Sequence, residues 1–163
     1  VFVRIKAVAF SGNGSPVRVF VIGNSFGFSA LFLGLLFRTK GSFLDALDLE
    51  PDACHRMGGW LTRAIARAQD LNISVTRGPS PQAVPSAMRG GSYDLAFIDG
   101  GHFEKQLQQD FEAVHPFMAA TSVIVLHDIV LVGLYDFVMR YFAASAWESH
   151  LPRGCTYKNI AGT

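Results

Sequence analysis

Residues 93–102 read Tyr-Asp-Leu-Ala-Phe-Ile-Asp-Gly-Gly-His, and residues 121–128 read Thr-Ser-Val-Ile-Val-Leu-His-Asp. Each segment contains a short apolar run, Leu95–Ile98 in the first and Val123–Leu126 in the second. Such runs are typical of strands that are buried on both faces of a parallel sheet. Both runs stop at acidic and histidine side chains, which are common metal ligands. The repetition predicts two strands that carry a polar site at their ends.

The segment between the two runs, residues 102–120, has the spacing of an amphipathic helix. Its apolar residues recur at intervals of three and four positions, at Phe103, Leu107, Phe111, Val114 and Met118. A strand, a helix and a second strand form a right-handed crossover whose strands run in the same direction. If the strands are neighbours, their carboxyl ends lie about 5 Å apart. Asp99 and Asp128 then meet at the sheet edge where ligands bind in such folds.

The rest of the chain continues this alternation. The expected strands are Val17–Ile22, Phe43–Leu47, Ile73–Thr76 and a last one at Gly154–Thr163, and the expected helices are Phe28–Arg38, Trp60–Asp70 and Val130–Phe142. Residues 1–10 fit either a short helix or an edge strand, and the glycines at 58 and 59 indicate a flexible link. The pattern predicts an α/β fold, a Rossmann-like, doubly wound, mostly parallel sheet with helices on both faces. At 163 residues, the chain is most simply one domain, residues 1–163.

The composition narrows the class of protein. Half of the residues are apolar, only 17% are charged, and the net charge is +1. The basic residues are scattered along the chain, which argues against a nucleic-acid partner. Cys54 and Cys155 stand in unrelated contexts and form neither a disulfide framework nor a zinc ligand set. We therefore expect free thiols and a cytoplasmic location.

One uncharged stretch, Val19–Phe37, is long enough to cross a bilayer. Its first half holds the polar and glycine cluster of residues 23–27, which indicates a turn between a strand and a helix. We therefore expect no membrane span.

The turn at Gly23–Gly27 follows the first predicted strand and opens a helix. Glycines at this place let the backbone approach a ligand closely, and a helix N-terminus offers free N–H groups. Asp48 ends the second predicted strand, where a carboxylate commonly accepts hydrogen bonds from a ribose. The full Gly-x-Gly-x-x-Gly fingerprint is absent, so a nucleotide without a pyrophosphate fits better. The alternative is that the glycines only form a tight packing turn.

Four motifs together resemble a known family. They are Val-Ile-Gly-Asn-Ser-Phe-Gly-Phe-Ser at 21–29, Leu-Asp-Leu-Glu-Pro-Asp at 47–52, Phe-Ile-Asp-Gly-Gly-His at 97–102 and Val-Leu-His-Asp-Ile at 125–129. Their order is similar to that of the class I S-adenosylmethionine-dependent methyltransferases. The closest branch is the metal-dependent small-molecule O-methyltransferases, which include the macrolide-sugar enzymes and, more distantly, catechol O-methyltransferase. The resemblance covers roughly residues 17–142.

The resemblance implies S-adenosylmethionine as cofactor and a divalent metal, Mg²⁺ above all. The implied cofactor-binding residues are Gly23, Asn24, Ser25, Gly27, Asp48, Gly78, Ser80 and Asp99, with the loop of residues 78–80 near the adenine. The implied metal ligands are Asp99, His127 and Asp128. His102, three residues after the first aspartate, is similar to the proposed general base of the family.

The resemblance also implies a reaction, the O-methylation of a small hydroxylated molecule of the sugar or polyketide type. A divalent cation lowers the pKa of a hydroxyl and fixes its oxygen. Carboxylates are the hard oxygen ligands that magnesium prefers, and a histidine can take the proton. The expected partner is therefore a small-molecule substrate. The apolar helix predicted at Val130–Phe142 also suggests a homodimer.

Two alternatives from other classes stay open. The family usually has an acidic residue at the position of Val21, so the chain could be a noncatalytic descendant that binds cofactor or a partner protein. It could also be a metal-dependent hydrolase or oxygenase on a similar sheet, because histidines and carboxylates also suit iron, manganese or zinc.

Individual residues also have plainer interpretations. Asp99 could cap the following helix, and His102 could be a solvated residue in its first turn. His127 could orient Asp128 instead of binding metal. We expect Asp110 to be a solvated or capping charge. Four aromatic residues are interpreted as core: Phe26, Phe28, Phe32 and Phe37.

Overall fold

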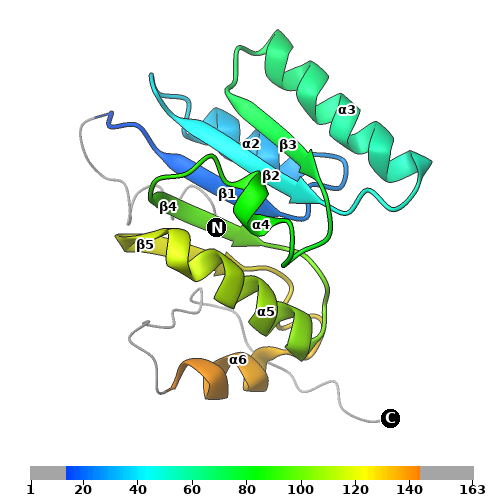
Figure 1. Ribbon diagram of the computed structural model, residues 1–163, viewed down its shortest axis with the longest axis vertical. Coiled ribbons are helices and arrows are strands. Elements are labelled where there is room, and N and C mark those ends of the chain that lie inside the picture. The colour runs from blue at the N-terminus through cyan, green and yellow to red at the C-terminus, as the bar shows by residue number, and fades with distance from the viewer. Residues whose placement is uncertain (1–13, 144–163) are drawn as a thin grey trace.

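The computed structural model describes residues 14–143, and the segments predicted at 1–10 and 154–163 lie outside these residues. The described chain forms a five-stranded sheet with helices on both faces (Figure 1). Its strands are β1 (Arg18–Ile22), β2 (Phe43–Asp48), β3 (Ile73–Arg77), β4 (Tyr93–Ile98) and β5 (Met118–Leu126). Its helices are α2 (Phe28–Leu36), α3 (Ala53–Ala68), α4 (Val84–Ala87), α5 (Glu104–Val114), a 3₁₀ turn η1 (His115–Phe117) and α6 (Tyr135–Phe142).

All neighbouring strands in the sheet are parallel, and their order is β3-β2-β1-β4-β5. The chain therefore builds outward from β1 to β3, returns to the other side of β1, and continues with β4 and β5. The strand order reverses between β1 and β4. In open α/β sheets, ligands bind at the carboxyl ends of the strands beside such a reversal. The predicted doubly wound fold is confirmed.

Alternate residues of the central strand β1 supply the two halves of the core. Val19 and Val21 pack on the face that is covered by α2, whereas Phe20 and Ile22 pack on the face covered by α4, α5 and α6. All four side chains are at most 2% exposed. A strand that is buried on both faces needs an apolar residue at every position. This requirement explains why the sequence shows an uninterrupted apolar run here.

Helix α3 begins seven residues earlier than we expected, because Asp52 caps its N-terminus with a hydrogen bond from the His55 amide. The interpretation of residues 58 and 59 as a flexible link is wrong. Both glycines are buried inside the helix, and a Cβ on Gly58 would overlap with the Ser25 carbonyl oxygen. Gly58 is therefore a packing residue that lets α3 approach the turn after β1, and Gly59 lets it approach the side chain of Glu50 after β2.

Two other predicted helices are too long. The helix expected at residues 102–120 ends at Val114, where a 3₁₀ turn containing Pro116 leads into β5. Residues 118–120 consequently belong to the strand. The helix expected from Val130 begins only at Tyr135, after a stretch of turns. Proline cannot continue an α-helix without losing a hydrogen bond, which explains the first of these differences.

The surface of α2 is more apolar than expected. Of the four aromatic residues interpreted as core, Phe37 is buried, but Phe26, Phe28 and Phe32 are 44%, 84% and 43% exposed. The prediction was therefore wrong for these three. None of the described helices has both the length and the apolar character needed to cross a membrane.

The glycine at position 23 is required by both its conformation and its neighbours. Its φ is +89°, and a Cβ there would overlap with the backbone carbonyl oxygen of Asp99. Gly90 has a φ of +90° but nothing within 4 Å of its Cβ position. We expect Gly23→Ala to lower the free energy of unfolding by about 2 kcal/mol more than Gly90→Ala does, because only Gly23 adds a steric clash to the backbone strain. Urea denaturation of both variants measures this difference, and equal losses would contradict the packing argument.

Candidate active site

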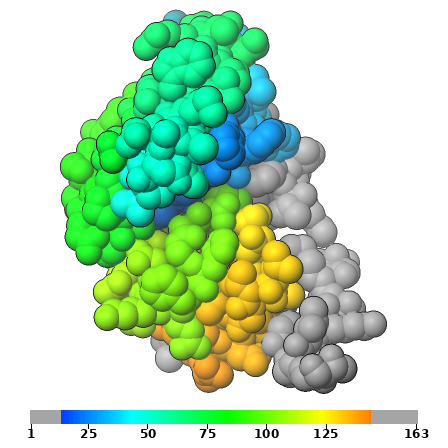
Figure 2. Space-filling model, turned by 90° about the vertical axis from the view of Figure 1, so that its right-hand side faces the viewer, coloured from blue at the N-terminus to red at the C-terminus, as the bar shows by residue number. Residues whose placement is uncertain are grey.

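The polar residues identified from the sequence gather at the carboxyl edge of the sheet. This edge faces the viewer in Figure 2, where the segments around residues 25, 50, 100 and 128 lie together on one surface. Backbone hydrogen bonds connect the exits of the central strands, from Gly23 to Leu47, from Asp99 to Ile22 and from His127 to Ile98. Four loops that are distant in sequence thus form one continuous site.

Asp48 is fixed by the loops on either side of it. One carboxylate oxygen accepts a hydrogen bond from the Ser25 amide at 2.7 Å, and the other accepts one from the Glu50 amide at 2.7 Å. Each carboxylate oxygen can accept a second hydrogen bond. Asp48 is only partly buried, so its remaining acceptor capacity can serve the two hydroxyls of a ribose.

Three non-glycine residues at this edge have positive φ angles: 44° at Ser25, 46° at Glu50 and 54° at Asp128. Such conformations cost free energy and are concentrated at functional sites. The turns after β1, β2 and β5 each contain such a residue, which makes them candidates for a functional site.

Asn24, a predicted cofactor-binding residue, has its side chain turned into the protein. It is 3% exposed, and its amide donates to the Thr62 hydroxyl at 3.1 Å and to the Ser25 carbonyl at 3.0 Å. Gly27 is in contact with the same threonine, because a Cβ on Gly27 would overlap with the Thr62 hydroxyl. These two residues therefore shape the turn by anchoring it to α3.

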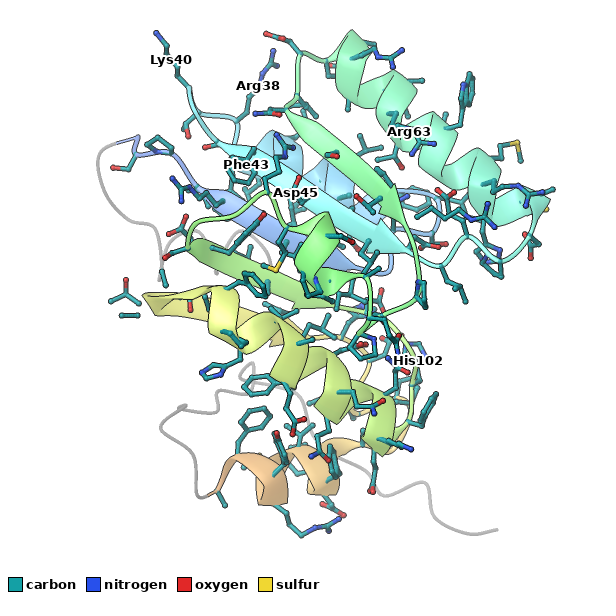
Figure 3. The ribbon with its side chains drawn as sticks, viewed as in Figure 1. Arg38, Lys40, Phe43, Asp45, Arg63 and His102 are labelled. Atoms are coloured by element: carbon teal, nitrogen blue, oxygen red, sulfur yellow. The ribbon has the colours of Figure 1, made fainter. Side chains whose placement is uncertain are left out.

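Asp99 is the centre of a cluster of histidines and carboxylates. Its Oδ1 lies 3.3 Å from Nε2 of His102 and 3.1 Å from Nδ1 of His127. The same His127 nitrogen lies 3.2 Å from Oδ1 of Asp128, and the His127 ring also contacts the ring of Phe97. The two histidines are more than 40% exposed at their side chains, whereas the carboxylates of Asp99 and Asp128 are 25% and 30% exposed. Figure 3 shows His102 at this edge of the sheet.

The donor set fits a divalent metal. Asp99, His102 and Asp128 each offer an atom, and these three atoms lie within 4.8 Å of one another. Adjacent ligands of an octahedral Mg²⁺ are about 3 Å apart, since each lies about 2.1 Å from the ion. Nδ1 of the predicted ligand His127 lies within hydrogen-bonding distance of both Asp99 and Asp128, at 3.1 Å and 3.2 Å. The three grouped donors are thus two of the predicted metal ligands, Asp99 and Asp128, together with the predicted base, His102.

The two glycines after Asp99 allow α5 to pack tightly below the cluster. A Cβ on Gly100 would lie 2.8 Å from Oδ2 of Asp110, and a Cβ on Gly101 would lie 2.8 Å from Cγ of Gln106. The sequence pattern Asp-Gly-Gly-His is therefore explained by packing as well as by chemistry.

The loop after β3, which contains the predicted cofactor residues Gly78 and Ser80, lies beside Asp48. The Gly78 amide donates to the Asp48 carbonyl at 2.9 Å. The peptide bond between Ser80 and Pro81 is cis. Gln106 of α5 donates to the Ser80 carbonyl at 3.0 Å, so this loop is joined to the helix that follows Asp99.

Asp110 is the residue whose surroundings the sequence concealed. We expected a solvated or capping charge, but its side chain is 0% exposed. Its Oδ1 accepts a hydrogen bond from the Gln106 amide at 2.8 Å, and its Oδ2 has no partner among the described residues. The helical spacing could have revealed this burial, because position 110 follows Leu107 by three residues and lies beside Phe111 on the apolar face.

Burial raises the pKa of the Asp110 carboxyl, and interactions with the side chains of Gln106 and Ser80 only partly offset this effect. The unfolded chain therefore loses this proton at lower pH than the folded chain does. Above the unfolded pKa, stability falls as pH rises through the folded pKa. We expect Asp110→Asn to gain stability relative to the wild type over this window. Thermal unfolding between pH 4 and pH 8 tests this, and a constant difference in Tm across the range would contradict the prediction.

A second buried carboxylate, Asp45, lies in β2 toward the opposite edge of the sheet. It accepts hydrogen bonds from the Arg89 guanidinium and from the Tyr93 hydroxyl, and burial raises the pKa of Tyr93. A surface cavity of about 200 Å³ lies at this edge, lined in part by Arg38, Lys40 and Phe43. Figure 3 shows these residues far from His102. We assign this edge a structural role.

The protein is a doubly wound α/β protein with a cluster of histidines and carboxylates beside the glycine turn. A family model described as a methyltransferase domain matches residues 20–129. The chain therefore belongs to this methyltransferase family. The match runs from the central strand to the residue after Asp128, so it includes the glycine turn, Asp48 and the whole Asp99 cluster.

Solved structures with the same fold include three bacterial proteins. The O-methyltransferase TomG from Streptomyces achromogenes, involved in tomaymycin synthesis and in complex with S-adenosylmethionine, is 17% identical with a TM-score of 0.65 over 83% of this chain and 64% of that one. A protein from Corynebacterium glutamicum is 17% identical with a TM-score of 0.69, covering 91% and 74%. An O-methyltransferase from Bacillus cereus in complex with S-adenosylhomocysteine is 16% identical with a TM-score of 0.60, covering 79% and 63%.

The chain is shorter than several of these proteins. It spans less than two thirds of TomG and of the Bacillus cereus enzyme. Among curated protein sequences, none matches this chain significantly. At these identities, the structural similarity establishes the fold.

Proposed function

We propose that the protein is an S-adenosylmethionine-dependent methyltransferase that methylates a hydroxyl of a small molecule with the help of a divalent metal, Mg²⁺ above all. The substrate we favour is a sugar or polyketide hydroxyl. The family match supports methyl transfer. Two of the similar structures are O-methyltransferases that contain S-adenosylmethionine or S-adenosylhomocysteine, which supports this cofactor and an oxygen acceptor.

The observation that carries the proposal is the direct contact between the two halves of the site. The Asp99 backbone amide donates to Ile22 at 2.9 Å, and its carbonyl oxygen fills the space beside Gly23. The same residue holds its carboxylate in the histidine cluster. A cofactor on the glycine turn would therefore lie next to the cluster that would hold the metal, and a substrate hydroxyl placed there could meet the methyl group in line.

The residues of this chain divide the work. Asp48 and the glycine turn would bind and orient the cofactor, which would supply the methyl group. Asp99, His127 and Asp128 would hold the metal, which would lower the pKa of a substrate hydroxyl. His102, whose side chain is partly exposed, would accept the proton of that hydroxyl at its ring nitrogen.

The base assignment of His102 gives a prediction that distinguishes it from a metal ligand. We expect His102→Ala to lower kcat by about 100-fold, in the range usual for the loss of a general base. The affinity for Mn²⁺, followed by electron paramagnetic resonance, should stay within about twofold of the wild type. A parallel loss of Mn²⁺ affinity would instead make His102 a ligand, as its place among the three grouped donors also allows.

The proposal is tested by methyl transfer from labelled S-adenosylmethionine to a panel of sugars, phenols and polyketide alcohols, with Mg²⁺ or with EDTA. We expect an ether product whose formation stops in EDTA. Asp128→Ala should lose both Mn²⁺ binding and transfer, whereas Asp136→Ala, on the nearby helix α6, should keep both. Transfer that is undiminished in EDTA, or that goes to nitrogen, would contradict the metal-assisted O-methyltransferase.

A further inference from the structure

We propose that Gln106 and Asp110 are positioning residues that hold the loops after β3 and β4 as two walls of the pocket for the adenine base. This inference rests on the proposed function, because it concerns the same cofactor.

Gln106 links two loops at this edge of the sheet. Its Nε2 donates to the Ser80 carbonyl at 3.0 Å and to Asp110 Oδ1 at 2.8 Å, and it lies 3.3 Å from the Ser80 hydroxyl. Its side-chain carbons pack against Gly101. One side chain thus contacts the loop after β3, the loop after β4 and a buried carboxylate on its own helix.

This link is also rigid. Asp110 is fully buried, and its Oδ2 packs against Gly100. Asp110 and Ile22 together leave no room for a larger residue at position 100. Buried hydrogen bonds in a region of low dielectric constant define one geometry strongly. The hydrogen bond to Asp110 therefore fixes the side chain of Gln106. If Gln106 turned away from Ser80, it would leave the buried Oδ1 of Asp110 without this hydrogen bond.

The two walls can also be placed relative to Asp48. Strands β3 and β4 flank β2 and β1 in the sheet, so loops from the outer pair can close over the ends of the inner pair. The Gly78 amide is hydrogen-bonded to the Asp48 backbone. A ribose held by the Asp48 carboxylate would lie beside the loop of residues 78–80, and we infer that its base would contact this loop. The turn at Gly100–Gly101 is joined to that loop through Gln106, and we infer that it would form the other side of the pocket.

Helix α5 contains a second pair of the same kind, which can serve as a control. Gln108 donates to Glu112 at 2.8 Å, which is again a glutamine and a carboxylate four residues apart. The hydrogen bond of that pair is exposed and joins two residues of α5 instead of joining the helix to a loop. Gln108→Ala is therefore a matched control for Gln106→Ala.

The test measures binding of S-adenosylhomocysteine, of adenosine and of Mn²⁺ to the purified chain. We expect Gln106→Ala and Asp110→Leu to weaken the binding of both nucleosides by the same factor, about tenfold, which corresponds to one buried hydrogen bond. Mn²⁺ affinity should stay within about twofold, and Gln108→Ala should bind all three like the wild type. Asp110→Asn keeps the acceptor oxygen for Gln106, so it should restore nucleoside affinity to within about threefold of the wild type.

Wild-type nucleoside affinity in both Gln106→Ala and Asp110→Leu would overturn the inference. An equal loss of nucleoside and Mn²⁺ affinity would also overturn it, because that result indicates a general disturbance of the sheet edge. A wild-type chain that binds Mn²⁺ but no S-adenosylhomocysteine would refute the proposed function itself, and this inference with it. Circular dichroism of each variant confirms that it is folded.

Discussion

Asp48→Ala is expected to weaken the binding of S-adenosylhomocysteine by at least about 100-fold. The substitution would remove the proposed acceptor for both ribose hydroxyls, and each hydrogen bond to a charged group is worth about 1.5–3 kcal/mol. It also releases the Ser25 and Glu50 amides, which now donate to the two oxygens of Asp48. The glycine turn would then lose its anchor to β2. Isothermal titration calorimetry of the variant against the wild type measures the loss.

Asp52→Ala is the matched control for this experiment. Asp52 lies four residues further along, and its side chain caps α3 through the His55 amide. Losing a helix cap costs about 1 kcal/mol of stability. We therefore expect Asp52→Ala to lower Tm and leave cofactor affinity unchanged. Similar losses of affinity in the two variants would show that Asp48 acts only through the stability of the loop.

Asp99→Asn is expected to have the second large effect, a loss of methyl transfer of at least about 100-fold. The substitution removes the negative charge at the centre of the cluster, where Oδ1 contacts the nitrogens of His102 and His127. Even residues that only support metal ligands typically change affinity or activity by 10- to 100-fold. A ligand shared between metal and base should therefore matter more. The rate with saturating Mg²⁺ and cofactor measures the effect.

Asp94→Asn provides the control on the same strand. Asp94 lies at the other end of β4, where its carboxylate accepts a hydrogen bond from the Arg18 amide. It is an aspartate on the same strand as the residues leading to Asp99, but it lies far from the histidine cluster. We expect it to retain wild-type rates and Mn²⁺ affinity. If Asp99→Asn bound Mn²⁺ as tightly as Asp94→Asn does, the metal assignment of Asp99 would be wrong.

The parallel sheet could be predicted because its signal is local. Strands buried on both faces appear as continuous apolar runs, and the runs ending at Ile22, Ile98 and Leu126 lie within a few residues of the observed strands. Loops of ordinary length then fix the crossovers. Helix ends were harder to predict. The start of α3 depends on the cap at Asp52. The end of α5 depends on Pro116, and a proline marks a helix end only ambiguously because it is also common in the first turn of a helix.

The clustering of Asp99, His102, His127 and Asp128 could also be predicted, because parallel neighbouring strands bring their carboxyl ends together. The orientation of side chains could not. The side chain of Asn24, a predicted cofactor-binding residue, bonds to Thr62 of α3. Asp110 was expected in solvent, yet it lies beneath Gly100. Both depend on how far two elements approach each other, which no spacing in one segment encodes.

The comparisons also bear on the alternative functions. Membership of the methyltransferase family favours methyl transfer over a metal-dependent hydrolase or oxygenase. A noncatalytic descendant would share the fold. Its motivation was the apolar residue at position 21, but Val21 is fully buried in β1 and packs against apolar residues of α2. The strained turns at Ser25 and Asp128 favour a working site, because such strain is retained where function requires it.

The most direct measurement is calorimetric titration of S-adenosylmethionine into the wild-type chain, with and without Mg²⁺. We expect one site per chain with micromolar affinity, and binding that persists without the metal because Asp48 and the glycine turn lie outside the cluster. The complete absence of binding at millimolar cofactor, from a chain whose circular dichroism shows it folded, would contradict the central claim that this sheet edge binds the methyl donor.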